Sequence, residues 1–137
     1  MFKKKARLPL DTVPPSGIFV RTPARGLYFV KDGKAFSISE IAFDTWKSQA
    51  VPITAMAFRS LESGGRLGFR DGTLVKDFGS GTIYLISNSR KRPITDPAIY
   101  ESLGGLGNTI TVASEYLKIH KEGEPLGSIE VDGGSSN

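Results

Sequence analysis

The chain has 137 residues, of which 39% are hydrophobic, and a formal net charge of +4. It contains no cysteine, which excludes disulfides, thiolate metal sites and a cysteine nucleophile. Apolar runs are all far shorter than the roughly 20 residues that a membrane-spanning helix requires. No apolar signal segment follows the lysines near the N-terminus, so the sequence predicts neither a membrane span nor a signal peptide.

The two ends of the chain differ in composition from the middle. Residues 1–15 contain Pro9, Pro14 and Pro15, which disfavour a helix. We expect an extended basic arm here, which either reaches onto a neighbouring molecule or remains disordered. Residues 128–137 end in a run of small and polar residues without a group to bury, and we expect a flexible tail. The basic residues of the arm are Lys3, Lys4, Lys5 and Arg7.

Residues 16–70 and 71–127 have matching patterns and predict an internal duplication. Apolar and turn residues recur in the same order at a spacing of about 55 residues, which is improbable by chance. The segments that align are 16–21 with 71–76, 27–30 with 83–86, 38–39 with 94–95, 53–54 with 110–111, and 67–68 with 126–127. A unit of this length is marginally stable alone, so we expect the two copies to pack against each other.

Each copy begins with three short segments that are rich in β-forming residues. In the first copy the second and third segments are separated by Asp32-Gly33, a strong signal for a two-residue hairpin turn. In the second copy Asn88 stands in the turn, and Asn tolerates a positive φ better than most residues. The third strand is expected to end at Ile38 or Ile94.

Helices are expected to follow the strands. Ser39 and Thr95 are predicted N-caps, because their hydroxyl groups can accept hydrogen bonds from the first turn of a helix. A second short helix is expected near residues 55–62 and 113–121. The predicted fold is therefore α+β, with two tandem pseudo-repeats that each form a small antiparallel sheet and one or two short helices.

The residues with catalytic potential do not form a pattern typical of an enzyme. His120 is the only histidine and is expected to be structural, because one imidazole makes neither a triad nor a zinc site. The glycine-rich stretch 104–107 lacks the Lys-Ser/Thr of a phosphate-binding loop. Asp44 and Glu101 occupy matching positions but are expected to be exposed helix residues. The sequence predicts a non-enzymatic protein without catalytic, cofactor-binding or metal-binding residues.

A partner-binding surface is the remaining prediction. Arg90, Lys91 and Arg92 form the most basic segment near a hairpin tip, and they suit a phosphate, an acidic partner or a glycan, or are simply solvated. Nucleic acid is the least favoured binding partner, because the overall charge is modest. The candidate partner-binding residues are Lys3, Lys4, Lys5, Arg7, Tyr28, Tyr84, Arg90, Lys91 and Arg92.

Charge is distributed unevenly along the chain. Residues 16–70 contain eight basic and four acidic residues, a net charge of +4, whereas residues 71–127 contain six and seven, a net charge of −1. This asymmetry could help copies dock head to tail, but a solvated surface of mixed charge is the favoured explanation.

The second copy resembles a repeat of bacterial extracellular proteins and phage virion proteins. The resemblance rests on Tyr84-Leu85-Ile86, on Lys91-Arg92-Pro93-Ile94, on Leu103-Gly104 and on Ile110-Thr111-Val112. It covers residues 71–127 well and residues 16–70 in outline.

The resemblance implies a non-catalytic surface or attachment module. Together with the short length and the arm, it leads us to expect a phage virion structural protein of the tail or attachment apparatus. Its partners would then be other virion subunits, with copies of the chain in a symmetric homo-oligomer. The alternative is a module that binds the bacterial cell wall or surface and acts outside the cell.

Overall fold

The computed structural model describes residues 8–127, so the basic arm residues Lys3, Lys4, Lys5 and Arg7 and the predicted tail at 128–137 lie outside the described residues. The chain divides into two compact units, which we call unit 1 and unit 2, with the boundary between Leu67 and Gly68. None of the helices in the described part is long and apolar enough to cross a membrane.

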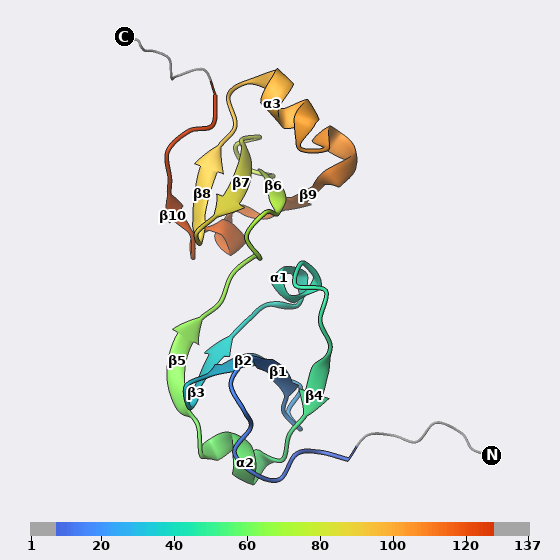
Figure 1. The fold of residues 1–137 in the computed structure, drawn as a ribbon, viewed down its shortest axis with the longest axis vertical. Coiled ribbons are helices and arrows are strands. Elements are labelled where there is room, and N and C mark those ends of the chain that lie inside the picture. Colours follow the sequence, from blue (N-terminus) through green and yellow to red (C-terminus); the bar gives the residue numbers. More distant parts are fainter. Residues whose placement is uncertain (1–7, 128–137) are drawn as a thin grey trace, which may run out of the picture. The chain divides into compact units, whose positions relative to one another are not determined.

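Unit 1 contains a five-stranded mixed sheet with strand order β4-β1-β2-β3-β5 (Figure 1). The three central strands form an antiparallel meander, and the two edge strands run parallel to their neighbours β1 and β3. The elements are β1 (Ile18–Arg21), β2 (Leu27–Lys31), β3 (Lys34–Ser37), α1 (Glu40–Asp44), β4 (Ala50–Pro52), α2 (Ala55–Arg59) and β5 (Glu62–Arg66).

Unit 2 has the same plan, with strand order β9-β6-β7-β8-β10. Its edge strands β9 and β10 are again parallel to their neighbours. The elements are β6 (Leu74–Asp77), β7 (Ile83–Ser87), β8 (Arg90–Pro93), α3 (Pro97–Ser102), the 3₁₀ helix η1 (Gly105–Asn108), β9 (Thr109–Val112), the 3₁₀ helix η2 (Ser114–Leu117) and β10 (Lys121–Glu122).

The register of the two sheets relates the units residue by residue. Val20 pairs with Tyr28 and Val51, and in the same way Val75 pairs with Tyr84 and Ile110. The N–H of Leu67 donates to Ser37, and the N–H of Leu126 donates to Pro93, at 2.8 and 2.7 Å. The predicted α+β class with two tandem sheet-and-helix units is therefore confirmed.

One part of the predicted alignment is wrong by two residues. Residues 53–54 were expected to match 110–111, but Val51 and Ile110 are equivalent in register, so Ile53 corresponds to Val112. Both of these side chains are buried. The pairs at residues 53–54 and 110–111 resemble each other in sequence, but the sheet register shows which residues are structurally equivalent.

The edge strands were not predicted, and the second helix of each copy is shorter than expected. The helix predicted at 55–62 ends at Arg59, because Glu62 already begins β5. The helix predicted at 113–121 is the single 3₁₀ turn η2, and β10 begins at Lys121. The predicted purely antiparallel sheet is therefore the centre of a larger mixed sheet.

Phe19 and Val20 are neighbours in β1 and pack on opposite faces of the sheet of unit 1, because successive side chains of a strand point to opposite faces. Phe19 packs against Phe43 and Trp46 on the α1 side, with ring centroids 4.9 and 5.8 Å apart. On the other face Val20 packs with Ala57 of α2 in one buried cluster. The sheet is thus covered by α1 on one face and by α2 on the other.

The turns between the central strands follow the prediction. Asp32 and Gly33 have φ values of 51° and 77°, and Asn88 and Ser89 have values of 52° and 64°. Two consecutive positive φ values are the signature of a type I′ hairpin.

The N-cap of α1 is Ser39, as predicted, but the predicted N-cap Thr95 is wrong for α3. Asp96 caps that helix, and its carboxylate accepts from the N–H of Ala98 at 2.9 Å. The hydroxyl of Thr95 instead donates to the carbonyl of Leu126 at 3.2 Å. Thr95 and Asp96 are adjacent, and both are residue types that can cap a helix. The bridge between Ile94 and Leu126 holds Thr95 in line with the sheet, so Asp96 is the residue that caps α3.

Part of the predicted arm belongs to unit 1. Leu10 forms a parallel bridge with Ile53, and the side chain of Asp11 accepts from the hydroxyl of Thr54 at 3.2 Å. Pro14 is buried. Within the described part of the arm, residues 8–15, Leu10 and Asp11 therefore lie at the edge of the sheet of unit 1.

Candidate functional site

The three basic residues predicted at the hairpin tip lie in β8 and hold the C-terminal part of unit 2. The guanidinium of Arg90 donates to the carbonyl of Glu122 at 3.2 Å, and that of Arg92 donates to the carbonyl of Glu124 at 2.8 Å. The Lys91 ammonium donates to the carbonyl of Leu117 at 3.2 Å. Each of the three basic side chains therefore uses one hydrogen-bond donor to hold the fold itself.

The two candidate tyrosines are largely covered. Tyr84 is 8% exposed, and the Lys91 ammonium lies 5.6 Å from the centroid of its ring. Tyr28 is half-buried and packs against Phe58 at 4.6 Å. Burial also raises the pKa of Tyr84, because the phenolate is poorly solvated there. Both rings therefore offer little surface to a partner. Partner binding stays a prediction, and among the described candidate residues it concerns mainly the arginines.

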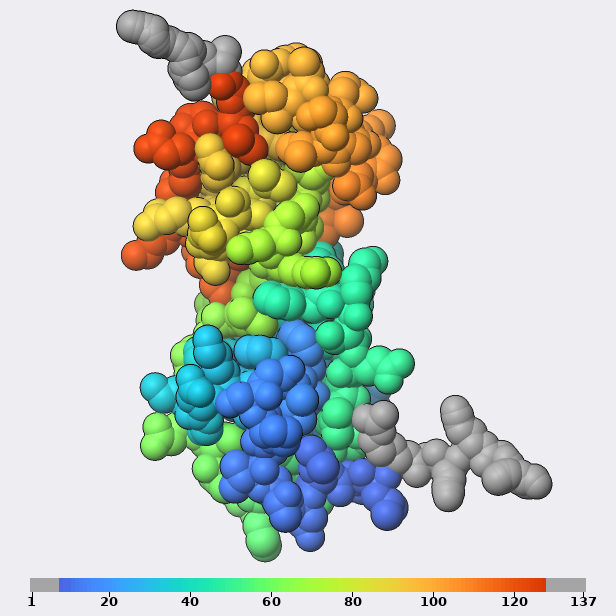
Figure 2. Space-filling model, in the orientation of Figure 1, coloured from blue at the N-terminus to red at the C-terminus, as the bar shows by residue number. Residues whose placement is uncertain are grey.

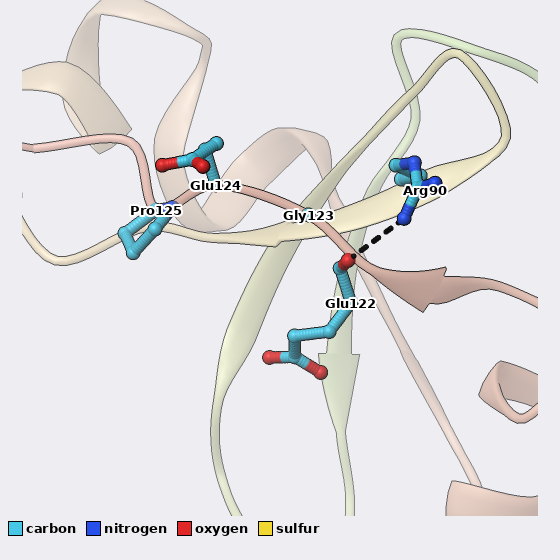
Figure 3. A pocket seen from close by; sticks show the side chains of 5 residues that line it. All are labelled: Arg90, Glu122, Gly123, Glu124 and Pro125. Atoms are coloured by element: carbon cyan, nitrogen blue, oxygen red, sulfur yellow. Dashed lines mark hydrogen bonds between the residues drawn. The ribbon is translucent and has the colours of Figure 1, made fainter.

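A shallow open pocket of about 360 Å³ lies beside Arg90 and is lined also by Glu122, Gly123, Glu124 and Pro125 (Figure 3). The drawn hydrogen bond joins Arg90 to the backbone carbonyl of Glu122. On the surface of unit 2 the segment around residue 90 and the segment around residue 122 lie side by side (Figure 2). The pocket is thus a polar, solvent-facing hollow lined by Arg90, Glu122 and Glu124, whose side chains point in different directions (Figure 3).

His120 lies outside this surface and is 4% exposed. Its Nε2 accepts from the N–H of Phe69 at 3.0 Å, and its Nδ1 lies 2.7 Å from the carbonyl of Ser89. A carbonyl can only accept, so Nδ1 must carry the proton and the ring must be neutral. Burial lowers the pKa of His120, which agrees with this state. The expected structural role of His120 is therefore consistent with its two internal hydrogen bonds.

A rigid loop with an exposed aromatic ring follows β6 and was not singled out by the sequence. The Asp77 carboxylate accepts from the N–H of Gly79 at 2.8 Å and from the hydroxyl of Ser114, and these bonds lower its pKa. The N–H of Phe78 donates to the carbonyl of Val112 at 2.8 Å, while the Phe78 side chain is 78% exposed. The signal in the sequence is a Phe between Asp and Gly in a glycine-rich turn.

The remaining candidates stay on the surface or in turns. Asp44 and Glu101 are exposed, each on the helix of its own unit. Gly104 has a φ of 111° and ends α3, as predicted, and residues 105–108 form a 3₁₀ turn. Among the described residues there is no group of three or more side chains that could hold a metal ion.

Comparison with known proteins yields no relative for this chain. No family model matches it, no curated protein matches it in sequence, and no solved structure matches its fold.

Proposed function

We propose that this chain is a non-catalytic structural protein of a phage particle, a component of the tail or attachment apparatus that mediates contacts between subunits. The observation that carries the proposal is the repetition of one mixed sheet, with the same strand order and the same parallel edges, in units 1 and 2. A repeated unit can offer a partner the same backbone framework twice, with different side chains on each copy.

The surface of unit 2 supports a role in contacts. Phe78 and Leu106 are 78% and 77% exposed, and both lie in turns that the backbone of unit 2 holds in place. Large apolar side chains on a rigid surface are common in protein interfaces, where their burial stabilises the complex. In the proposed assembly these side chains face neighbouring subunits.

The direct test is to look for the chain in purified particles. Particles purified by density gradient and washed in high salt should retain the chain, because apolar contacts do not weaken when charges are screened. A control protein from the host lysate should be removed by the same wash. Loss of the chain together with the control would reject the assembly function.

A second candidate function is binding to the bacterial cell wall. The observation that favours it is the polar pocket beside Arg90, whose lining includes Arg90, Glu122 and Glu124, side-chain types that can hydrogen-bond a hydroxyl-rich glycan. Its volume of about 360 Å³ lies within the range of small-molecule sites.

Sedimentation with cell walls distinguishes the second candidate from the first. If the pocket binds glycan, Glu124→Gln should lower retention of the chain on walls at moderate salt. Glu101→Gln, a change of the same type at an exposed helix position, is the matched control. Equal retention of the two variants and the unmodified chain would exclude this pocket as a wall-binding site.

A further inference from the structure

The outer edge of the sheet in unit 1 is occupied by the chain's own N-terminal segment. The N–H of Leu10 donates to the carbonyl of Pro52 at 2.8 Å, and the N–H of Thr54 donates to the carbonyl of Leu10 at 2.9 Å. The Leu10 side chain packs against the buried cluster that includes Ile53 and Ala57. One extended residue therefore caps β4 with two backbone hydrogen bonds and one apolar contact.

Unit 2 presents the same edge along β9. Thr111, Val112 and Ala113 are the equivalents of Pro52, Ile53 and Thr54, as the register of the two sheets shows. The carbonyl of Val112 accepts from Phe78 on the inner side of the strand, at 2.8 Å. Because backbone groups alternate in direction along a strand, the carbonyl of Thr111 and the N–H of Ala113 point outward.

This edge of unit 2 is not covered by any described part of the chain. Thr111 and Ala113 are exposed, and no described residue pairs with their outward backbone groups. An unpaired edge with outward N–H and C=O groups is a template for another extended segment. The edge that Leu10 occupies in unit 1 is therefore available in unit 2.

Two large apolar side chains belong to residues connected with β9, one by a short separation in sequence and one by a backbone hydrogen bond. Tyr116 stands at the position equivalent to Ala57 and is 38% exposed. Phe78, whose N–H is bonded to Val112, is 78% exposed. Tyr116, whose N–H donates to the carbonyl of Ala113 at 3.0 Å, offers partly exposed apolar surface next to this edge, whereas Phe78 lies on the inner side of β9.

We infer that the outer edge of β9 binds an extended, leucine-bearing segment of a different protein in the parallel orientation that Leu10 has on β4. Its backbone N–H would donate to the carbonyl of Thr111, and its carbonyl would accept from the N–H of Ala113. The inference deepens the proposed assembly function, on which it rests, by naming the type of contact: addition of a strand to a sheet edge.

The occupant belongs to a different protein because this chain's own matching segment is already used. Leu10 is held by two backbone hydrogen bonds in unit 1, and exchange onto β9 of a second copy would break both of them. Such an exchange would gain no net pairing.

The test uses the full chain and a synthetic peptide with the sequence of residues 8–15, which contains the residue that occupies the equivalent edge of unit 1. Amide NMR signals of residues 109–114 should shift saturably as peptide is added. Ala113→Pro removes the outward N–H, and Ala113 has a φ of −66° that proline adopts without strain. This variant should bind the peptide about five- to tenfold more weakly, which corresponds to the loss of one hydrogen bond.

Ala113→Ser is the matched control, because it changes the side chain at the same position and keeps the N–H. It should bind the peptide like the unmodified chain. The inference is overturned if residues 109–114 do not shift, or if Ala113→Pro binds as well as Ala113→Ser. It is also overturned if these signals shift with protein concentration alone, since the occupant would then be a second copy. Peptide binding does not require the particle, so failure here leaves the test on purified particles independent.

Discussion

His120 occupies a position that in unit 1 belongs to the apolar residue Leu61. The N–H of Leu61 donates to Phe58 and that of His120 donates to Leu117, so the two residues end equivalent turns. The difference between them follows from the neighbouring backbone. Phe69 has an N–H that must be paired when buried, whereas its equivalent Pro14 has none. The imidazole in unit 2 supplies the acceptor that unit 1 does not need.

Unit 2 should lose stability as the pH falls below about 6.5, the ordinary pKa of an unfolded-state histidine. Burial lowers the pKa of His120 in the folded state, so the unfolded state takes up the proton first. The stabilising contribution is complete above the unfolded pKa and is lost on acidification. Protonation would also turn Nε2 into a donor that faces the N–H of Phe69, with Lys91 adding repulsion and Asp71 partly offsetting it.

The measurement is urea unfolding of the full chain between neutral and mildly acidic pH, followed by NMR signals of unit 2. His120→Leu, which copies Leu61, should cost about 1–3 kcal/mol at pH 7, because the buried N–H of Phe69 and the partly buried carbonyl of Ser89 lose their partner. It should also flatten the pH dependence. Trp46, the only tryptophan, reports on unit 1 and serves as the internal control. An equally steep loss of stability in the variant would contradict the role assigned to His120.

At the scale of elements, the segment at residues 8–11 acts as an additional strand for unit 1. Leu10→Ala should lower the free energy of unfolding of unit 1 by about 1–2 kcal/mol, because the Leu10 side chain is partly buried in the core cluster. Leu8→Ala is the matched control, since Leu8 is 83% exposed. Trp46 fluorescence during urea unfolding measures both. Equal stability of the two variants would show that the segment contributes nothing to unit 1.

The central meander of each unit could be predicted from sequence because its signals are local. Ile83–Ser87 alternates β-forming residues, and the Asp32-Gly33 turn fixes the hairpin register. The edge strands lack such signals. The segment Glu62–Arg66 has the sequence Glu-Ser-Gly-Gly-Arg, and it becomes a strand only because β3 provides a pairing partner. No local pattern predicts pairing that depends on a neighbour in space.

The sequence predicted which basic residues belong to the candidate site, but not which groups their side chains contact. The charge of Arg90, Lys91 and Arg92 was evident, yet the carbonyl groups that they bind lie 26 to 32 residues further along the chain. The importance of Thr111 and Ala113 depends on comparing two sheet edges. That comparison requires the register, which the sequence alignment misplaced by two residues at this point.

At the scale of the whole molecule, the two units share a fold and differ at one edge. Unit 1 covers the edge of β4 with its own Leu10, and unit 2 leaves the equivalent edge of β9 exposed within residues 8–127. Two related sheets, one with this edge covered and the other with it exposed, suit an assembly in which unit 2 receives a segment from a neighbour. The charge difference between residues 16–70 and 71–127 would help to orient such contacts.

The proposed assembly role can be tested by the copy number of the chain in purified phage particles, obtained by quantitative mass spectrometry against a subunit of known number. We expect several copies at a constant ratio, because a structural subunit fills a symmetric assembly. A chain that is absent from the particles, or present at a ratio that varies between preparations, would contradict it.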